Sequence, residues 1–202
     1  MELYRLRKKD INRAAEVLGK AYLDYLPLAY LVPDEKRLKK YVKDMYKIEL
    51  KLRFRHGEIY GTSPDLEGVI AWIFSDNYNI SLFEQLRTGG LLLIFKIGIG
   101  AIKRFLSIES FFTSIHMQHM KIPHWLLGPF GVDPLNQGKG IGSFLLRRLF
   151  KVADSSEHPI YLYTSTEKNF LIYQHMGFQL IEKVNYPDGN IPFWFMIRYP
   201  QL

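Results

Sequence analysis

The feature that most constrains the fold is a glycine-rich loop between a strand pattern and a helix pattern. The apolar run Trp125–Val132 is bounded by prolines and predicts a short buried strand. Gly128-Pro129 lies inside this run, and proline cannot donate a ladder hydrogen bond, so we expect the strand to bulge or splay there. The sequence then reads Gln137-Gly138-Lys139-Gly140-Ile141-Gly142-Ser143 and continues into a helix pattern over 141–153.

A loop of this kind is suited to bind phosphate. The first turn of a helix has unpaired backbone N–H groups, and the helix dipole adds partial positive charge there. Glycines let a ligand approach the backbone closely, and Lys139 adds a cation. The nucleotide patterns G-x-x-x-x-G-K-[ST] and G-x-G-x-x-G both fail, because Gly140 follows Lys139 and the spacing is Gly138-x-Gly140-x-Gly142. The remaining pattern is Gln137-x-x-Gly140-x-Gly142, with an ordinary strand–helix turn as the alternative.

A second segment strengthens the phosphate-binding interpretation. It reads Asn169-Phe-Leu-Ile-Tyr173-Gln-His-Met-Gly177-Phe178 and follows another short apolar strand pattern, Ile160–Thr164. The two segments together resemble the GNAT superfamily of acyl-coenzyme A N-acyltransferases. That family has a (Arg/Gln)-x-x-Gly-x-(Gly/Ala) loop and a downstream Asn, Tyr and Gly-Phe. The close resemblance covers about residues 124–180.

The resemblance implies a site for acetyl-coenzyme A as acyl donor. Backbone N–H groups of the loop would hold the pyrophosphate, and the splayed strand would pair with the pantetheine amides. The N–H of Val132 would also polarise the thioester carbonyl, and Asn169 would bind the pantetheine arm. The residues expected to bind the donor are Phe130, Gly131, Val132, Gln137, Gly138, Lys139, Gly140, Ile141, Gly142, Ser143 and Asn169.

The reaction implied by the resemblance is direct attack of an amine on the acetyl thioester in a ternary complex. Tyr173 would protonate the departing thiolate, because a phenol with a pKa of about 10 is protonated at neutral pH. The chain contains no cysteine, which agrees with a mechanism that needs no thiol nucleophile. Three alternatives stay open: Tyr173 as a core aromatic, Asn169 as a helix cap, and the whole chain as a non-catalytic coenzyme A-binding or sensing module.

The base that deprotonates the acceptor is less clearly marked. His124 precedes the central strand, and histidine changes charge near neutral pH, so we select it as the candidate. His116, His119, Glu58 and Glu67 are alternatives, as is a water molecule. No spacing of these side chains matches a known metal-ligand pattern, so no metal is expected.

The resemblance implies a mixed α/β fold, in which helices flank a central, largely antiparallel sheet. A splayed parallel pair, Trp125–Val132 and Ile160–Thr164, would lie at the coenzyme A site. Residues 1–202 are expected to form a single GNAT-like N-acetyltransferase domain with a helical insert at about 76–121 that breaks at Gly89-Gly90. The opening pattern predicts a strand over 3–7, a helix capped by Asp10 and ended by Pro27, a helix capped by Asp34, and a hairpin over 58–74. A final strand pair is expected over 178–184 and 193–199.

Charge and hydropathy limit the expected partners. Residues 1–56 hold 15 of the 27 Lys and Arg but 8 of the 20 Asp and Glu, so the net charge of +7 arises in the first quarter of the chain. No base-reading motif accompanies it, and no nucleic-acid partner is expected. The most apolar stretch, 89–102, is short for a membrane span and contains Lys96, so no membrane partner is expected. We expect a cytoplasmic monomer or homodimer.

The acceptor is expected to be a small-molecule amine. The first two helices, the 76–121 insert and the turn over 186–192 would shape its site. Aromatic side chains in the insert and near the turn favour a hydrophobic or aromatic amine. These side chains are Phe83, Phe95, Phe105, Phe111, Phe112, Tyr186 and Phe193.

Overall fold

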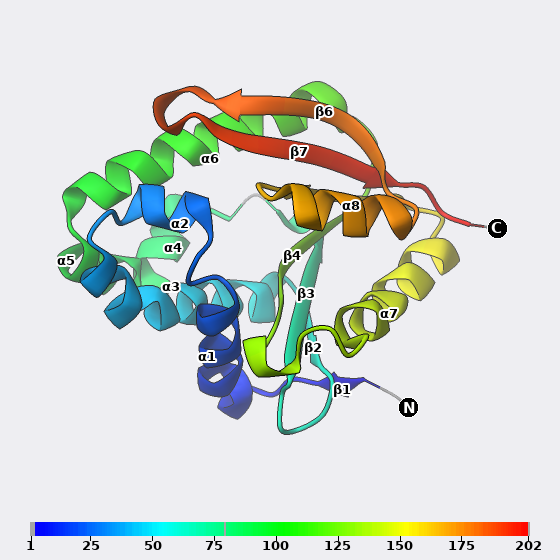
Figure 1. Ribbon diagram of the computed structural model, residues 1–202, viewed down its shortest axis with the longest axis horizontal. Coiled ribbons are helices and arrows are strands. Elements are labelled where there is room, and N and C mark those ends of the chain that lie inside the picture. The colour runs from blue at the N-terminus through cyan, green and yellow to red at the C-terminus, as the bar shows by residue number, and fades with distance from the viewer. Residues whose placement is uncertain (1–2, 79, 202) are drawn as a thin grey trace.

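The computed structural model describes residues 3–78 and 80–201. In this part of the chain a seven-stranded sheet has the order β1-β2-β3-β4-β5-β7-β6 and is antiparallel except for the pair β4–β5 (Figure 1). This mixed, largely antiparallel arrangement confirms the expected fold class. The strands are β1 (Tyr4–Arg5), β2 (Gly57–Gly61), β3 (Gly68–Phe74), β4 (Trp125–Val132), β5 (Ile160–Thr164), β6 (Gln179–Tyr186) and β7 (Ile191–Arg198).

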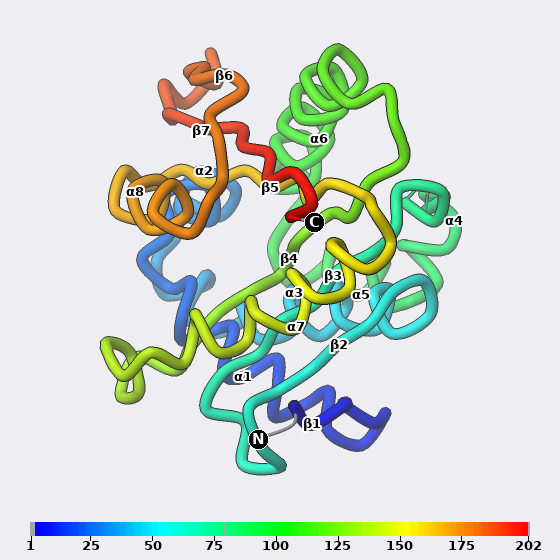
Figure 2. The backbone as a smooth tube through the Cα atoms, turned by 90° about the vertical axis from the view of Figure 1, so that its right-hand side faces the viewer, coloured from blue at the N-terminus to red at the C-terminus, as the bar shows by residue number. Residues whose placement is uncertain are grey.

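Helices cover both faces of the sheet. They are α1 (Ile11–Ala21), α2 (Leu26–Leu31), α3 (Glu35–His56), α4 (Leu82–Gln85), α5 (Leu91–Ile97), α6 (Ile99–His119), α7 (Ile141–Ser155) and α8 (Glu167–His175). Figure 2 shows β7 lying between α8 on one side and α6 on the other. In the described residues, no helix combines the length and the apolar character that a membrane crossing requires.

Alternation along the strands places apolar clusters on both faces of the sheet, because successive side chains point to opposite faces. In β5, Tyr161 packs in the cluster formed with α2, α3 and α6. Its neighbours Ile160 and Leu162 pack instead in the cluster under α7 and α8. A third cluster joins α1 to β2 and β3. The sheet therefore separates the two helical layers, and a site between its central strands can be reached by side chains from both.

The beginning of the chain differs from the sequence prediction in two places. The carboxylate of Asp10 does not cap α1; it accepts hydrogen bonds from the backbone N–H of Arg7 and the hydroxyl of Tyr4. Helix α1 ends at Ala21, and Pro27 lies in the first turn of α2. Proline is tolerated there because the first N–H groups of a helix have no partner within the helix. The other prediction is confirmed: Asp34 caps α3 by accepting the N–H of Arg37 at 3.0 Å.

Residues 82–119 are largely helical, and glycines mark the changes of direction. Gly89 has φ +131° and Gly98 has φ +89°, conformations that glycine adopts without the steric cost of a side chain. The break at Gly89 matches the sequence prediction, whereas the break at Gly98 was not predicted. After Gly98 the long helix α6 runs beside the β6–β7 hairpin (Figure 1).

The central strands separate soon after they begin. β4 and β5 pair only through Trp125 with Ile160 and Leu126 with Tyr161. The register against β3 then shifts where β4 passes Gly128-Pro129, and the two parallel strands diverge. This confirms the splayed pair that the proline inside the strand predicted. The divergence leaves one side of β4 without a neighbouring strand from Leu127 onward.

Candidate active site

The loop after β4 is held in an open shape. The carboxylate of Asp133 accepts the N–H of Leu135 at 3.1 Å, and the carbonyl oxygen of Asp133 accepts the N–H of Asn136 at 2.8 Å. Gly138 and Gly140 both have φ +77°, and a Cβ atom at either position would have no heavy atom within 4 Å. The space beside these two glycines can therefore receive a ligand.

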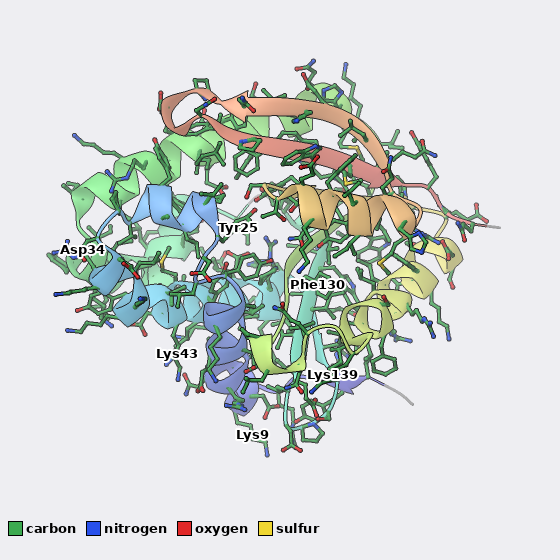
Figure 3. All side chains as sticks on the ribbon, viewed as in Figure 1. Lys9, Tyr25, Asp34, Lys43, Phe130 and Lys139 are labelled. Atoms are coloured by element: carbon green, nitrogen blue, oxygen red, sulfur yellow. The ribbon has the colours of Figure 1, made fainter. Side chains whose placement is uncertain are left out.

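The side chains of the loop stabilise the loop itself. Gln137 donates from Nε2 to the carbonyl oxygen of Val132 at 3.2 Å, which ties the loop to the end of β4. Lys139 donates from Nζ to Leu135 O and Asn136 Oδ1, so its cation stays beside the loop (Figure 3). Helix α7 begins at Ile141, and the first-turn N–H groups of Ile141, Gly142 and Ser143 have no partner inside the helix. These N–H groups and Lys139 together provide the positive charge that a phosphate needs.

The exposed side of β4 presents backbone hydrogen-bonding groups. Asp133 donates its N–H to Glu67 O, and Gly131 lies in register with Val69, so Asp133 and Gly131 turn their backbone groups toward β3. Backbone direction alternates along an antiparallel strand, so Phe130 and Val132 direct their N–H and C=O groups away from β3. The register thus leaves Gly131, one of the expected donor-binding residues, facing the neighbouring strand.

A cavity of about 650 Å³ lies along the split between β4 and β5. Residues 126–130 of β4, Leu162 and Tyr163 of β5, and Tyr173 of α8 form one wall. Tyr22 and Tyr25 contribute from the end of α1 and its junction with α2, and Figure 3 labels Tyr25 together with Phe130. The remaining walls come from α2, α3, α6 with Phe105, and the segment before α5, which contributes Tyr78, Ile80, Leu82 and Gln85.

Tyrosine hydroxyls gather where the cavity meets the strands. The hydroxyl of Tyr22 donates to the carbonyl oxygen of Phe130 at 2.7 Å. Burial raises the pKa of Tyr22 and of Tyr25, and it raises the pKa of Tyr173 well above its ordinary value. These phenols are therefore protonated at neutral pH. The proton of Tyr22 is taken up by Phe130 O, whereas Tyr173 can donate its proton to a ligand in the cavity.

An ionic cluster occupies the wall formed by α3 and α6. Arg53 donates from Nη2 to Glu49 Oε1 at 2.8 Å, and Glu109 of α6 lines the same cavity. Burial, together with the negative charge of Glu49, raises the pKa of Glu109 to about 7, and Arg53 partly opposes this rise. Tyr78 lies against the guanidinium with its ring centre 6.0 Å away, and Tyr163 is a further phenol close to Glu109. A carboxyl group that titrates near neutral pH can accept a proton there.

Sequence reasoning missed this cluster. Glu49 and Arg53 are spaced i, i+4 on α3; Glu49 lies between the apolar residues Met45 and Leu52, and Arg53 follows Leu52 directly. Two charged residues on the apolar side of a helix are the signal that identifies such a pair. Glu109 has no comparable sequence signal, because its position depends on how α6 folds back against α3.

The structure places His124 away from the cavity. Its side chain is buried; Nδ1 lies 2.7 Å from Ile122 O, and Nε2 lies 2.7 Å from His116 Nε2. A carbonyl oxygen only accepts, so Nδ1 carries the proton and Nε2 accepts from His116. Burial lowers the pKa of both rings, that of His116 to about 4. Both nitrogens of His124 are thus engaged within the fold.

The other candidate bases also make local contacts outside the cavity lining. His119 contacts Glu182 at 2.8 Å, Glu58 accepts the hydroxyl of Tyr60, and Glu67 accepts the hydroxyls of Thr62 and Ser63. Across residues 3–78 and 80–201, no three His, Asp or Glu side chains meet in a metal-binding arrangement.

Asn169 lies in the first turn of α8 and does not cap it. Its backbone N–H donates to the hydroxyl oxygen of Thr166, and Thr166 is the cap. The capping role considered for Asn169 is therefore wrong. Its side chain does not line the cavity.

The expected acceptor-site aromatics divide into three groups. Phe105 lines the cavity, and Phe111, Phe112, Tyr186 and Phe193 pack against one another in the core. Phe83 and Phe95 point outward and are 73% and 81% exposed. The turn over 186–192 does not contribute to the lining, whereas the ends of the first helices and the insert do.

Comparisons with known proteins agree with the fold. No family model matches the chain. An uncharacterised N-acetyltransferase of Schizosaccharomyces pombe is 28% identical over the whole chain and 84% of its own length. The histone acetyltransferase HPA2 and related acetyltransferase of Corynebacterium glutamicum is 18% identical and superposes with a TM-score of 0.70 over 100% of this chain and 98% of its own. The PaiA N-acetyltransferase of Thermoplasma acidophilum, solved in complex with coenzyme A, gives 0.57 at 15% identity, with 98% of each chain covered.

The structural likeness defines the fold as that of the GNAT acetyltransferases. The sequence relationship to the S. pombe protein extends along the full chain. In fold, and in sequence along its full length, the chain is therefore similar to the N-acetyltransferases of the GNAT type.

Proposed function

We propose that the protein is an N-acetyltransferase that moves the acetyl group of acetyl-coenzyme A to a primary amine bound in the 650 Å³ cavity. One observation carries the proposal. The open glycine loop follows the outward-facing backbone of β4, and Tyr173 lines the cavity along the split between β4 and β5. The arrangement of these three features matches acetyl-coenzyme A, which carries its phosphates at one end and its reactive thioester at the other.

The loop is suited to the anionic end of the donor. N–H groups of residues 138–143 would bind the pyrophosphate, because Gly138 and Gly140 let it approach the backbone. The N–H of Val132 would hold the pantetheine arm along the split. Val132 lies at the loop end of β4 and does not line the cavity. We therefore place the thioester carbonyl nearer the N–H of Phe130, which faces the split.

Each remaining chemical step has a residue of this chain beside it. The amine nitrogen attacks the thioester carbon, and the developing oxyanion accepts a hydrogen bond from the Phe130 N–H. The C–S bond then breaks, and Tyr173 donates its proton to the departing thiolate. The acceptor ammonium must lose one proton before the attack, and its nitrogen loses a second proton after it, which restores the proton of Tyr173. Glu109 lines the cavity with a pKa raised to about 7, so we assign it this role in place of His124.

The first test uses two substitutions at Gly142. Its φ is not in the left-handed region, and a Cβ there would contact Phe130 Cζ at 3.4 Å, which is an ordinary packing distance. Gly142→Asn and Gly142→Asp therefore add side chains of the same shape without backbone strain, and only the second adds a negative charge. Two like charges in a partly screened site interact by ~1–3 kcal/mol. Calorimetry should show acetyl-coenzyme A binding to Gly142→Asp about 10–100-fold more weakly than to Gly142→Asn.

Turnover is measured with the wild-type protein by thiol release over a panel of primary amines. Release that requires both acetyl-coenzyme A and an amine supports the proposal. Donor binding without acetylation of any amine in the panel would favour the non-catalytic sensing module. A folded wild type that binds no acetyl-coenzyme A would contradict both functions.

A further inference from the structure

The cavity continues past Glu49 into a smaller space between α3 and the helices of the insert. This side chamber measures about 140 Å³. Glu49, Leu52 and Phe105 line both the main cavity and the side chamber, whereas Tyr173 and β4 line only the main cavity. A ligand that extends from the strands therefore passes Glu49 before it enters the chamber.

The walls that belong to the side chamber alone are apolar. They include Ile48, Leu93, Ile94, Ile97, Ala101 and Ile102. Transfer of a charged group into such surroundings is costly, whereas each buried methylene stabilises a complex. The chamber is thus suited to hydrocarbon and unsuited to a second ammonium or to a carboxylate.

The charges at the entrance give the ligand a direction. Glu49 and Glu109 contribute two carboxyl groups against the single guanidinium of Arg53. A cationic head group would offset the negative charge that Glu109 carries when it is ionised, and an anionic one would add to it. The head group therefore belongs at Glu49 and Glu109, on the side of the chamber that faces the strands.

We propose that the side chamber binds the apolar tail of the acceptor, which is a primary monoamine with an alkyl or aryl group of about six carbons. The size follows from the chamber volume of about 140 Å³, since an engineered apolar cavity of ~150 Å³ holds benzene. This inference rests on the proposed acetyltransferase function and names the class of its acceptor.

An n-alkylamine series from ethylamine to octylamine, with putrescine as a polar comparison, tests the tail. Each methylene that enters the chamber should raise kcat/KM roughly fourfold until the chamber is full. Putrescine should fall well below hexylamine, because its second ammonium would enter an apolar space.

Two tryptophan substitutions on neighbouring residues of α5 provide the matched pair. Ile94 is half-buried and lines the chamber, whereas Phe95 is 81% exposed and does not. Ile94→Trp should remove most of the increase in kcat/KM from ethylamine to hexylamine and leave kcat/KM for ethylamine nearly unchanged. Phe95→Trp should follow the wild-type series. Thermal unfolding of both variants shows whether the fold is retained.

The outcomes separate the inference from the function on which it rests. A wild type that acetylates ethylamine, hexylamine and putrescine equally would overturn the tail site and leave the function standing. Equal losses on all amines in Ile94→Trp would overturn it too. If acetyl-coenzyme A binds but no amine is acetylated, hexylamine is titrated into the complex with coenzyme A, and no binding there overturns the tail site. Absence of acetyl-coenzyme A binding in the first place overturns both.

Discussion

Replacement of Glu109 by Gln should make the protein more stable in mild alkali and change little in mild acid. Glu109 has a pKa raised from 4.5 to about 7, chiefly by burial and then by Glu49. In the unfolded chain the carboxyl would titrate at its ordinary value. A raised pKa means that the folded state favours the protonated form. Its contribution to stability is complete below the unfolded pKa and is lost as pH rises through about 7.

The difference between 4.5 and about 7 corresponds to ~3 kcal/mol of unfolding free energy at pH 8.5. At pH 5 the ionisation of Glu109 lowers the unfolding free energy by less than ~1 kcal/mol. Gln resembles the protonated carboxyl in shape and carries no charge. Glu109→Gln should therefore exceed the wild type in stability by about 3 kcal/mol at pH 8.5 and by much less at pH 5.

Urea denaturation at the two pH values, followed by tryptophan fluorescence, measures the difference. Glu157→Gln is the control, because Glu157 is exposed. A gain in Glu109→Gln that is the same at both pH values would refute the reasoning, since it would not arise from ionisation. The same variant also tests Glu109 as the general base. Wild-type kcat/KM should rise as the pH passes about 7, and this rise should be absent in Glu109→Gln.

Three further substitutions test separate parts of the structure. Tyr173→Phe should lower kcat by about 10²-fold or more while acetyl-coenzyme A affinity, measured by calorimetry, stays within a few-fold of wild type. Asp154→Ala should cost about 3–5 kcal/mol in urea denaturation, because it leaves Arg198, which is 3% exposed and bonded to Asp154 at 2.7 Å, as an unpaired buried charge. Thr166→Ala should cost about 1 kcal/mol by removing the cap of α8, and a cost near zero would mean that another group replaces it.

The elements around the glycine loop were predictable because several local signals agree there. An apolar run bounded by prolines gives the strand Trp125–Val132, and a second short apolar run gives Ile160–Thr164, both with the limits that the structure shows. Pro129 inside the first of them predicts the separation from β5. Proline near the ends of helices is a weaker signal, because it is compatible both with the end of one helix and with the start of the next. Pro27 is an example of the second case.

The acceptor side of the site was only partly predictable. Aromatic composition indicates an apolar pocket, but it does not tell which rings face it, and Phe95 turns to solvent while Phe105 turns inward. The ionic cluster combines Glu49 and Arg53 with Glu109, which is far away in the sequence. Whether these three side chains lie together depends on the path of the chain after Gly98. Helical periodicity predicts that a helix forms and does not specify that path.

The short contact between β4 and β5 has a mechanical consequence. It divides the sheet into two blocks, β1–β4 and β5–β7–β6, that pair with each other only at one end. Val132 lies six residues beyond the junction at Leu126, or ~20 Å along the strand. A rotation of about 3° between the two blocks would therefore move Val132 by about 1 Å while Leu126 hardly moves. Leverage of this kind concentrates any flexing of the sheet at the mouth of the split, beside the glycine loop.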